Sequence, residues 1–198
     1  MRTEKKTLRL TSMGLLSALV AVLALLGNFI KIGPFPITLT LTPIIIGGAL
    51  FGPLSGAILG FIFGLVTLIT GMLGWDGGGV LAMFSANPVM LVVLCIGKAV
   101  AAGYVGGLVY KALSGKVNPT LAVIISGIAT PVTNTGVFLI GMFTVFSEML
   151  KAWAGGTNVL TYAITGLVGV NFLMEVFINL ILATSVTFII RYAARYNK

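Results

Sequence analysis

Residues 41–60 read LTPIIIGGALFGPLSGAILG and contain no charged side chain. About twenty apolar residues are enough to cross the hydrocarbon core of a bilayer. The short uncharged turn Phe51-Gly-Pro-Leu-Ser55 interrupts this stretch, so it is interpreted as the end of one apolar run and the start of the next. The same turn also leaves open that the two runs form one long span.

The whole chain has the composition of a membrane protein. Of its 198 residues, 58% are hydrophobic and 8% are charged, and the mean hydropathy is +1.14. Soluble domains contain about 25% charged residues, so a water-soluble fold of this length could not hide so much apolar surface. The composition excludes a cytosolic enzyme, a nucleic-acid-binding module and a disordered regulator. The absence of His and the single cysteine, Cys95, exclude zinc sites of Cys and His and intramolecular disulfides.

The apolar runs predict an all-α integral membrane protein with a single transmembrane domain, residues 1–198. The expected spans are residues 8–30, 39–51, 54–73, 88–113, 119–146 and 160–190. The second run is short and contains Pro43, whereas the other five are long enough to cross a bilayer. Basic residues precede the first run as in a signal peptide. This first run is longer than the apolar core of a signal peptide, and no clear cleavage site follows it. We therefore expect that it is not cleaved and forms the first span.

The positions of the basic residues favour six spans over five. Nine of the twelve Lys and Arg residues fall in three places, namely Arg2, Lys5, Lys6 and Arg9; Lys111 and Lys116; and Arg191, Arg195 and Lys198. With six spans all three places lie on one side, which the positive-inside rule makes cytoplasmic. We therefore expect six transmembrane helices with both termini inside and outer loops at residues 31–38, 74–87 and 147–159.

Charged and amide side chains at membrane depth mark a candidate site. Lys98 lies ten residues into the fourth span and Glu175 fifteen residues into the sixth, where a charge costs about 2.5–3.5 kcal/mol on insertion scales. Asn171 belongs to the same helix stripe as Glu175, and Asn134 follows the kink expected at Pro131. One interpretation is a polar cavity, open to the outside, that binds an anionic, hydroxyl-bearing ligand. The other is a buried Lys98–Glu175 ion pair that holds the bundle together.

Three further residues are candidates for the same site. Asn87 lies on the helix face of Lys98, Tyr162 lies near the start of the last span, and Trp75 precedes a flexible run of glycines in an outer loop. Aromatic residues in such loops either form a lid over an external site or simply occupy the membrane–water interface. In the first span, Gly14 and Ala18 form a small-xxx-small pair that suits either a partner helix or packing within the bundle.

No motif for catalysis, metal binding or cofactor binding occurs in the sequence. It lacks the G-x-x-x-x-G-K-[ST] phosphate loop, paired carboxylates and an H-E-x-x-H helix. We therefore expect no enzyme activity, no cofactor and no metal, and any ATP hydrolysis must come from another protein.

These features together resemble the substrate-binding (S) components of energy-coupling factor (ECF) vitamin transporters. The strongest part of the resemblance is FGPLSGAILG, residues 51–60, and the expected architecture adds to it. In that family the S component binds a vitamin or vitamin precursor near the outer face of the bacterial cytoplasmic membrane. It docks, through small residues of its first helix, on a transmembrane coupling protein that carries two ATPase subunits. The resemblance thus implies an S-component-like bundle with a pocket near the outer face, and Gly14 and Ala18 as the docking pair.

Three short motifs resemble the S components assigned to pantothenate. They are Phe84-Ser-Ala-Asn-Pro88, Pro131-Val-Thr-Asn-Thr-Gly136 and Val170-Asn-Phe-Leu-Met-Glu175. Under this interpretation Lys98 meets the carboxylate of pantothenate, and Asn134, Asn171 and Glu175 meet its hydroxyl groups and its amide. Riboflavin S components tend to have a lysine on the sixth helix, where this chain has Glu175. Another vitamin such as riboflavin, or a membrane scaffold that transports nothing, stays an alternative.

Overall fold

The computed structural model describes the backbone of residues 2–29 and 39–196, and the side chains of residues 6–29 and 39–192. Every regular element in this part of the chain is a helix. The elements are α1 (Arg2–Gly27), α2 (Leu41–Phe51), α3 (Pro53–Met72), α4 (Gly79–Ala86), α5 (Pro88–Leu113), α6 (Pro119–Thr144), α7 (Ser147–Ala154), α8 (Val159–Thr161), the π-helical η1 (Tyr162–Gly169) and α9 (Val170–Tyr196). The outer loop expected at residues 31–38 lies outside the described residues.

Five of these helical segments are long and apolar enough to cross a membrane. They are Lys6–Gly27, Pro53–Met72, Pro88–Leu113, Pro119–Thr144 and Val159–Tyr192. The run expected at residues 39–51 forms α2, whose 11 residues span about 17 Å, against about 30 Å for the hydrocarbon core. The all-helical bundle is confirmed, and the described residues contain the five long apolar helices and the one short apolar helix that the sequence predicted.

Proline and asparagine residues set where the long helices begin. Pro53, Pro88 and Pro119 open α3, α5 and α6, where the missing N–H of proline costs nothing because it would have no partner within the helix. The side chains of Asn87 and Asn118 cap α5 and α6 by accepting backbone hydrogen bonds at 3.1 and 2.9 Å. A cap of this kind satisfies one of the unpaired N–H groups of the first helical turn.

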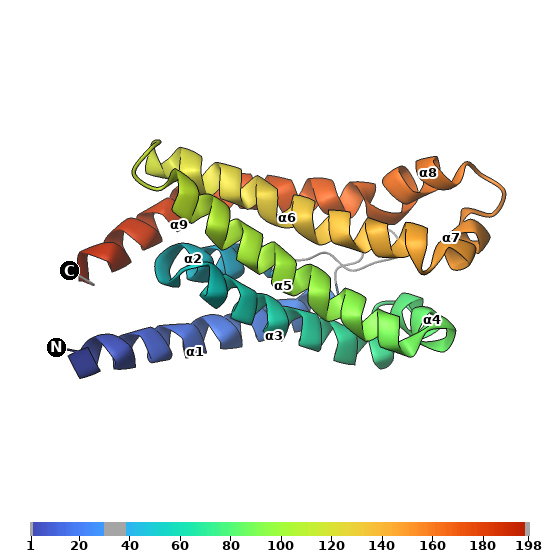
Figure 1. Ribbon diagram of the computed structural model, residues 1–198, viewed down its shortest axis with the longest axis horizontal. Coiled ribbons are helices and arrows are strands. Elements are labelled where there is room, and N and C mark those ends of the chain that lie inside the picture. Colours follow the sequence, from blue (N-terminus) through green and yellow to red (C-terminus); the bar gives the residue numbers. More distant parts are fainter. Residues whose placement is uncertain (1, 30–38, 197–198) are drawn as a thin grey trace.

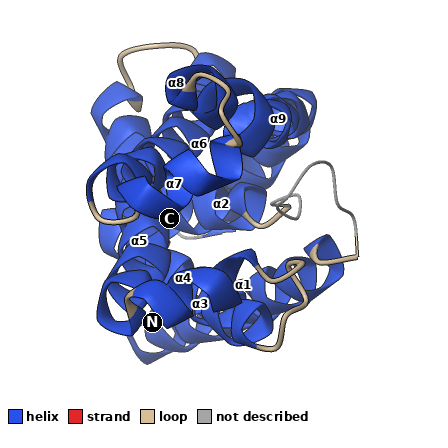
Figure 2. Cartoon of the chain, turned by 90° about the vertical axis from the view of Figure 1, so that its right-hand side faces the viewer, coloured by secondary structure: helices blue, strands red, loops and turns tan. Residues whose placement is uncertain are grey.

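Helix α2 lies in the middle of the bundle. Figure 2 shows α1, α3 and α4 on one side and α6 to α9 on the other, with α2 and α5 between them. Helix α2 contacts α1, α3, α5, α6 and α9, and seven of its residues are buried. Its apolar sequence is therefore explained by burial within the protein.

Glycines bring α3 and α5 into backbone contact. A methyl group on Gly56 would collide with the carbonyl oxygen of Gly103, and one on Gly60 would collide with that of Ala99. Small residues at four-residue spacing allow this close approach of two helices. Gly52 has a different role. It has a φ of 95°, which glycine adopts readily, and at this residue α2 ends and the chain turns into α3.

The two ends of the bundle differ in the segments that they hold. Figure 1 places the start of α1, the α5–α6 turn and the end of α9 at one end, and α4, α7 and α8 at the other. The three segments that contain the basic clusters of the sequence therefore gather at the same end of the molecule.

Candidate functional site

A cavity of about 90 Å³ lies within the bundle, toward the end that holds α4. A buried cavity needs about 10–15 Å³ of accessible volume to hold one water. This cavity therefore has room for several waters or for a ligand that displaces them. Its apolar lining includes Phe63, Met83 and Leu94. Its polar lining consists of Asn28, Thr40, Thr67, Asp76, Lys98, Asn134, Thr135, Asn171 and Glu175.

Four of the residues singled out in the sequence meet at this cavity. Lys98 comes from α5, Asn134 from α6, and Asn171 and Glu175 from α9. Asn171 and Glu175 lie one turn apart, so they share a helix face. Glu175 is 2% exposed and Asn134 5%, which shows that these polar groups are held inside the bundle.

The ammonium group of Lys98 lies against an aromatic ring. Its Nζ is 4.8 Å from the ring centroid of Phe138, another lining residue, within the range of a cation–π contact. The side chains of Lys98 and Glu175 line the same cavity, so the ion pair between them stays one of the two interpretations.

Three buried oxygen atoms at the cavity accept no hydrogen bond. They are Thr40 Oγ1, Asn134 Oδ1 and Asn171 Oδ1, counted over the described residues. A buried acceptor without a donor costs about 1–3 kcal/mol, and native proteins satisfy nearly all such groups. The cavity therefore favours a guest that supplies O–H or N–H donors.

Asp76 is a lining residue from the outer loop expected at residues 74–87, and the sequence analysis did not count it among the candidates. It is 4% exposed, and its carboxylate accepts the backbone N–H groups of Gly78 at 3.1 Å and Val80 at 2.7 Å. These N–H groups belong to the start of α4, where a negative charge is stabilised by the helix dipole. An acidic residue directly before an apolar run is the sequence signal that could have indicated this role.

Three other candidates lie outside the cavity lining. Asn87 uses its side chain to cap α5, where Oδ1 accepts the N–H of Met90. Trp75 is 44% exposed and its ring lies 6.4 Å from that of Phe29. Tyr162 packs against an apolar cluster, so the site proposed below does not include these three residues.

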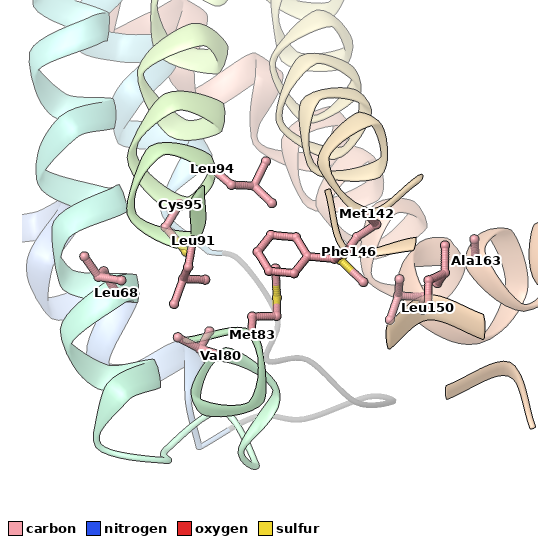
Figure 3. Close-up of a cluster of buried hydrophobic side chains, with 11 residues drawn as sticks. Leu68, Val80, Met83, Leu91, Leu94, Cys95, Met142, Phe146, Leu150 and Ala163 are labelled. Carbon is pink, nitrogen blue, oxygen red and sulfur yellow. The ribbon is translucent and has the colours of Figure 1, made fainter. Parts of the chain in front are cut away.

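That apolar cluster forms one wall of the cavity. Figure 3 shows Phe146, beyond the end of α6, among Met83 of α4 and Leu91 and Leu94 of α5. Met83 and Leu94 belong both to the cluster and to the cavity lining, as do Val80, Cys95 and Leu167. The polar groups therefore face apolar surface across the cavity, an arrangement typical of small-molecule sites.

The first helix leaves its small-residue pair uncovered. Gly14 and Ala18 are exposed, and a methyl group on Gly14 would meet no atom within 4 Å. Over the apolar window of α1 only 11% of the residues are buried. Near its start, Arg9 Nη2 donates to Ser55 Oγ at 3.2 Å. Gly14 and Ala18 therefore serve no packing within the described part of the chain.

Comparisons with known proteins agree with this arrangement. The family described as the substrate-specific component of ECF transporters matches residues 8–190. The pantothenic acid transporter PanT of Lactococcus lactis subsp. cremoris (strain MG1363) is 29% identical over 180 residues, which cover 85% of this chain and 86% of that relative. The family and this relative indicate a transporter subunit and not an enzyme, and five long apolar helices fit a multi-pass membrane protein. The chain belongs to the family of ECF transporter substrate-specific components.

Proposed function

We propose that this chain binds pantothenate on the outer side of the bacterial cytoplasmic membrane for import by an ECF transporter. The observation that supports this ligand most directly is the cavity, which combines one ammonium group with three unsatisfied acceptors. The similarity to a pantothenic acid transporter agrees with it.

The functional groups of pantothenate match those of the cavity. Its carboxylate is the partner for Lys98 Nζ, because a charge-assisted hydrogen bond is the strongest that this lining can offer. Its two hydroxyl groups and its amide N–H are donors for Asn134 Oδ1, Asn171 Oδ1 and Thr40 Oγ1. Its geminal methyl groups suit the apolar part of the lining, to which Phe63 and Met83 belong.

The proposed topology has six membrane passes in one domain, with α2 as the short pass. Both termini and the α5–α6 turn then lie in the cytoplasm, where their basic residues obey the positive-inside rule. The cavity lies toward the opposite end and faces the outside. Because the chain has no ATP-binding motif, we propose that a transmembrane coupling protein with two ATPase subunits docks on Gly14 and Ala18.

Native mass spectrometry of the detergent-purified protein tests the ligand. The panel contains pantothenate, riboflavin and other vitamins, each at the same concentration. We expect a 1:1 adduct with pantothenate alone. A riboflavin adduct without a pantothenate adduct would overturn the ligand and keep the family, whereas a folded protein that binds no vitamin would favour the scaffold alternative.

A further inference from the structure

Pro131 leaves a backbone acceptor of α6 without its helical donor. In an α-helix the N–H of residue 131 would donate to the carbonyl of Gly127, and proline has no N–H. The amide of Asn179, on α9, donates to Gly127 O instead, with Nδ2 at 3.0 Å in a buried contact. A side chain of one helix thus replaces the missing backbone group of another.

The other end of the same amide reaches a third helix. Asn179 Oδ1 accepts the hydroxyl of Thr42, on α2, at 2.8 Å. Asn179 is 6% exposed, and both ends of its amide are in use, so its orientation is fixed. We call Thr42, Asn179 and the Gly127 carbonyl the amide relay. The relay joins α2, α6 and α9 through one side chain.

Each residue of the amide relay stands beside a residue of the cavity. Thr42 follows Thr40 by two residues, Asn179 follows Glu175 by one helical turn, and the freed carbonyl of Gly127 lies about two helical turns before Asn134. The relay residues themselves do not line the cavity. They lie on the three helices that contain or adjoin the polar lining residues Thr40, Asn134 and Glu175.

We infer that Asn179 and Thr42 are positioning residues for the ligand site. By holding α2, α6 and α9 in register, the amide relay keeps the oxygen atoms of Thr40, Asn134 and Glu175 at one cavity. A site of this kind binds well only when surrounding contacts hold the ligand-binding side chains in place. The inference rests on the proposed function in assuming that the cavity is the ligand site.

The first arm of the test measures affinity for pantothenate by isothermal titration calorimetry. Thr42→Val keeps the shape of the side chain and removes its hydroxyl, and Thr42→Ser restores a hydroxyl. We expect Thr42→Val to weaken binding by about three- to tenfold, the equivalent of one hydrogen bond, and Thr42→Ser to recover to within about twofold.

A matched control separates positioning from general stability. Ser126 Oγ donates to Gly106 O at 2.7 Å, a buried hydrogen bond between α6 and α5 outside the amide relay. Ser126→Ala should lower the melting temperature about as much as Thr42→Val, because each removes one buried hydrogen bond. We expect it to leave the affinity unchanged. An equal loss of affinity in both variants, or wild-type affinity in Thr42→Val, would overturn the inference.

The second arm needs no vitamin. Cys95 is the only cysteine of the chain and lines the cavity, so its reaction rate with a small methanethiosulfonate reports how often the cavity walls open. We expect Thr42→Val to raise this rate at least about threefold in the ligand-free protein, the equivalent of one lost hydrogen bond, with Thr42→Ser and Ser126→Ala near wild type. If wild-type protein does not bind pantothenate, the proposed ligand fails and this rate alone decides; an unchanged rate in Thr42→Val then overturns the relay.

Discussion

The charge of a single side chain sets which ligand the proposed site accepts. Lys98→Met keeps most of the apolar stem and removes the ammonium group. A hydrogen bond to a charged group contributes about 1.5–3 kcal/mol, so we expect the Kd for pantothenate, measured by calorimetry, to rise at least about tenfold. Lys151→Met is the control, because Lys151 is exposed and pairs with Glu148 at 2.7 Å, away from the cavity. Equal affinities in wild type and Lys98→Met would remove Lys98 from the site.

The unsatisfied oxygen of Asn134 predicts opposite effects on stability and on binding. Asn134→Leu removes a buried acceptor that has no donor in the described structure. The ligand-free protein should therefore melt at or above the wild-type temperature, whereas pantothenate affinity should fall about tenfold or more. Thermal shift with and without pantothenate measures both effects. A lower melting temperature with unchanged affinity would identify Asn134 as a structural residue.

At the residue scale, the sequence indicated a polar stripe on the last span. It could not show which residues of the stripe line the cavity and which contact another helix. Asn171 and Asn179 lie on the same face of α9, yet Asn171 lines the cavity and Asn179 completes the backbone of α6. The difference depends on which helix packs beside each residue, and that information is tertiary. Asp76 was missed for a related reason, because its burial follows from the position of α4 over the cavity.

At the element scale, Pro131 of α6 and the Asn179 amide of α9 should be energetically coupled. Asn179→Ala leaves the Gly127 carbonyl unpaired, so we expect the melting temperature in detergent to fall by about 2–4 °C. In a Pro131→Ala background the backbone N–H at position 131 can donate to that carbonyl. The same Asn179→Ala change should then cost less. Equal costs in the two backgrounds would show that Asn179 does not replace the missing N–H.

A π-helical segment separates Tyr162 from the polar stripe of α9. The sequence analysis placed Tyr162 near the start of the last span, as a further candidate for the site of Asn171 and Glu175. Residues Tyr162–Gly169 form η1 instead, in which hydrogen bonds run from i to i+5 and each turn holds more residues. The face of Tyr162 is rotated away from the cavity, and periodicity at 3.6 residues cannot reveal such a change.

At the scale of the whole molecule, a substitution on the uncovered face of α1 should separate binding from transport. Gly14→Leu would fill the exposed gap beside Ala18 without touching the cavity. We expect pantothenate binding to stay at the wild-type level and uptake to be lost in cells that contain the ECF module. Gly14→Ala should keep uptake, because a methyl group still allows close helix approach. Normal uptake by Gly14→Leu would place the docking surface elsewhere.

Hydropathy predicted the membrane bundle well because five of its helices are long and apolar and keep much of that apolar surface unburied within the protein. Burial among other helices demands the same apolar residues as burial in lipid, so hydropathy alone could not show that the short α2 lies in the middle of the bundle. The basic clusters predicted that the two termini and the α5–α6 turn lie on the same side, and the structure places those segments at one end of the molecule. Charge positions therefore indicated the arrangement of the two ends, whereas the burial of α2 among other helices required the structure.

The glycine contacts between α3 and α5 have a consequence for how the molecule comes apart on heating. An ordinary core loosens as its side chains change rotamers, but glycines set against a backbone carbonyl have no side-chain torsion to change. Helix α1 is bound through far less buried surface, so its opening free energy is lower. We expect hydrogen–deuterium exchange to show α1 detaching first, while α3 and α5 exchange last and together. Uniform exchange over these three helices would contradict this order of melting.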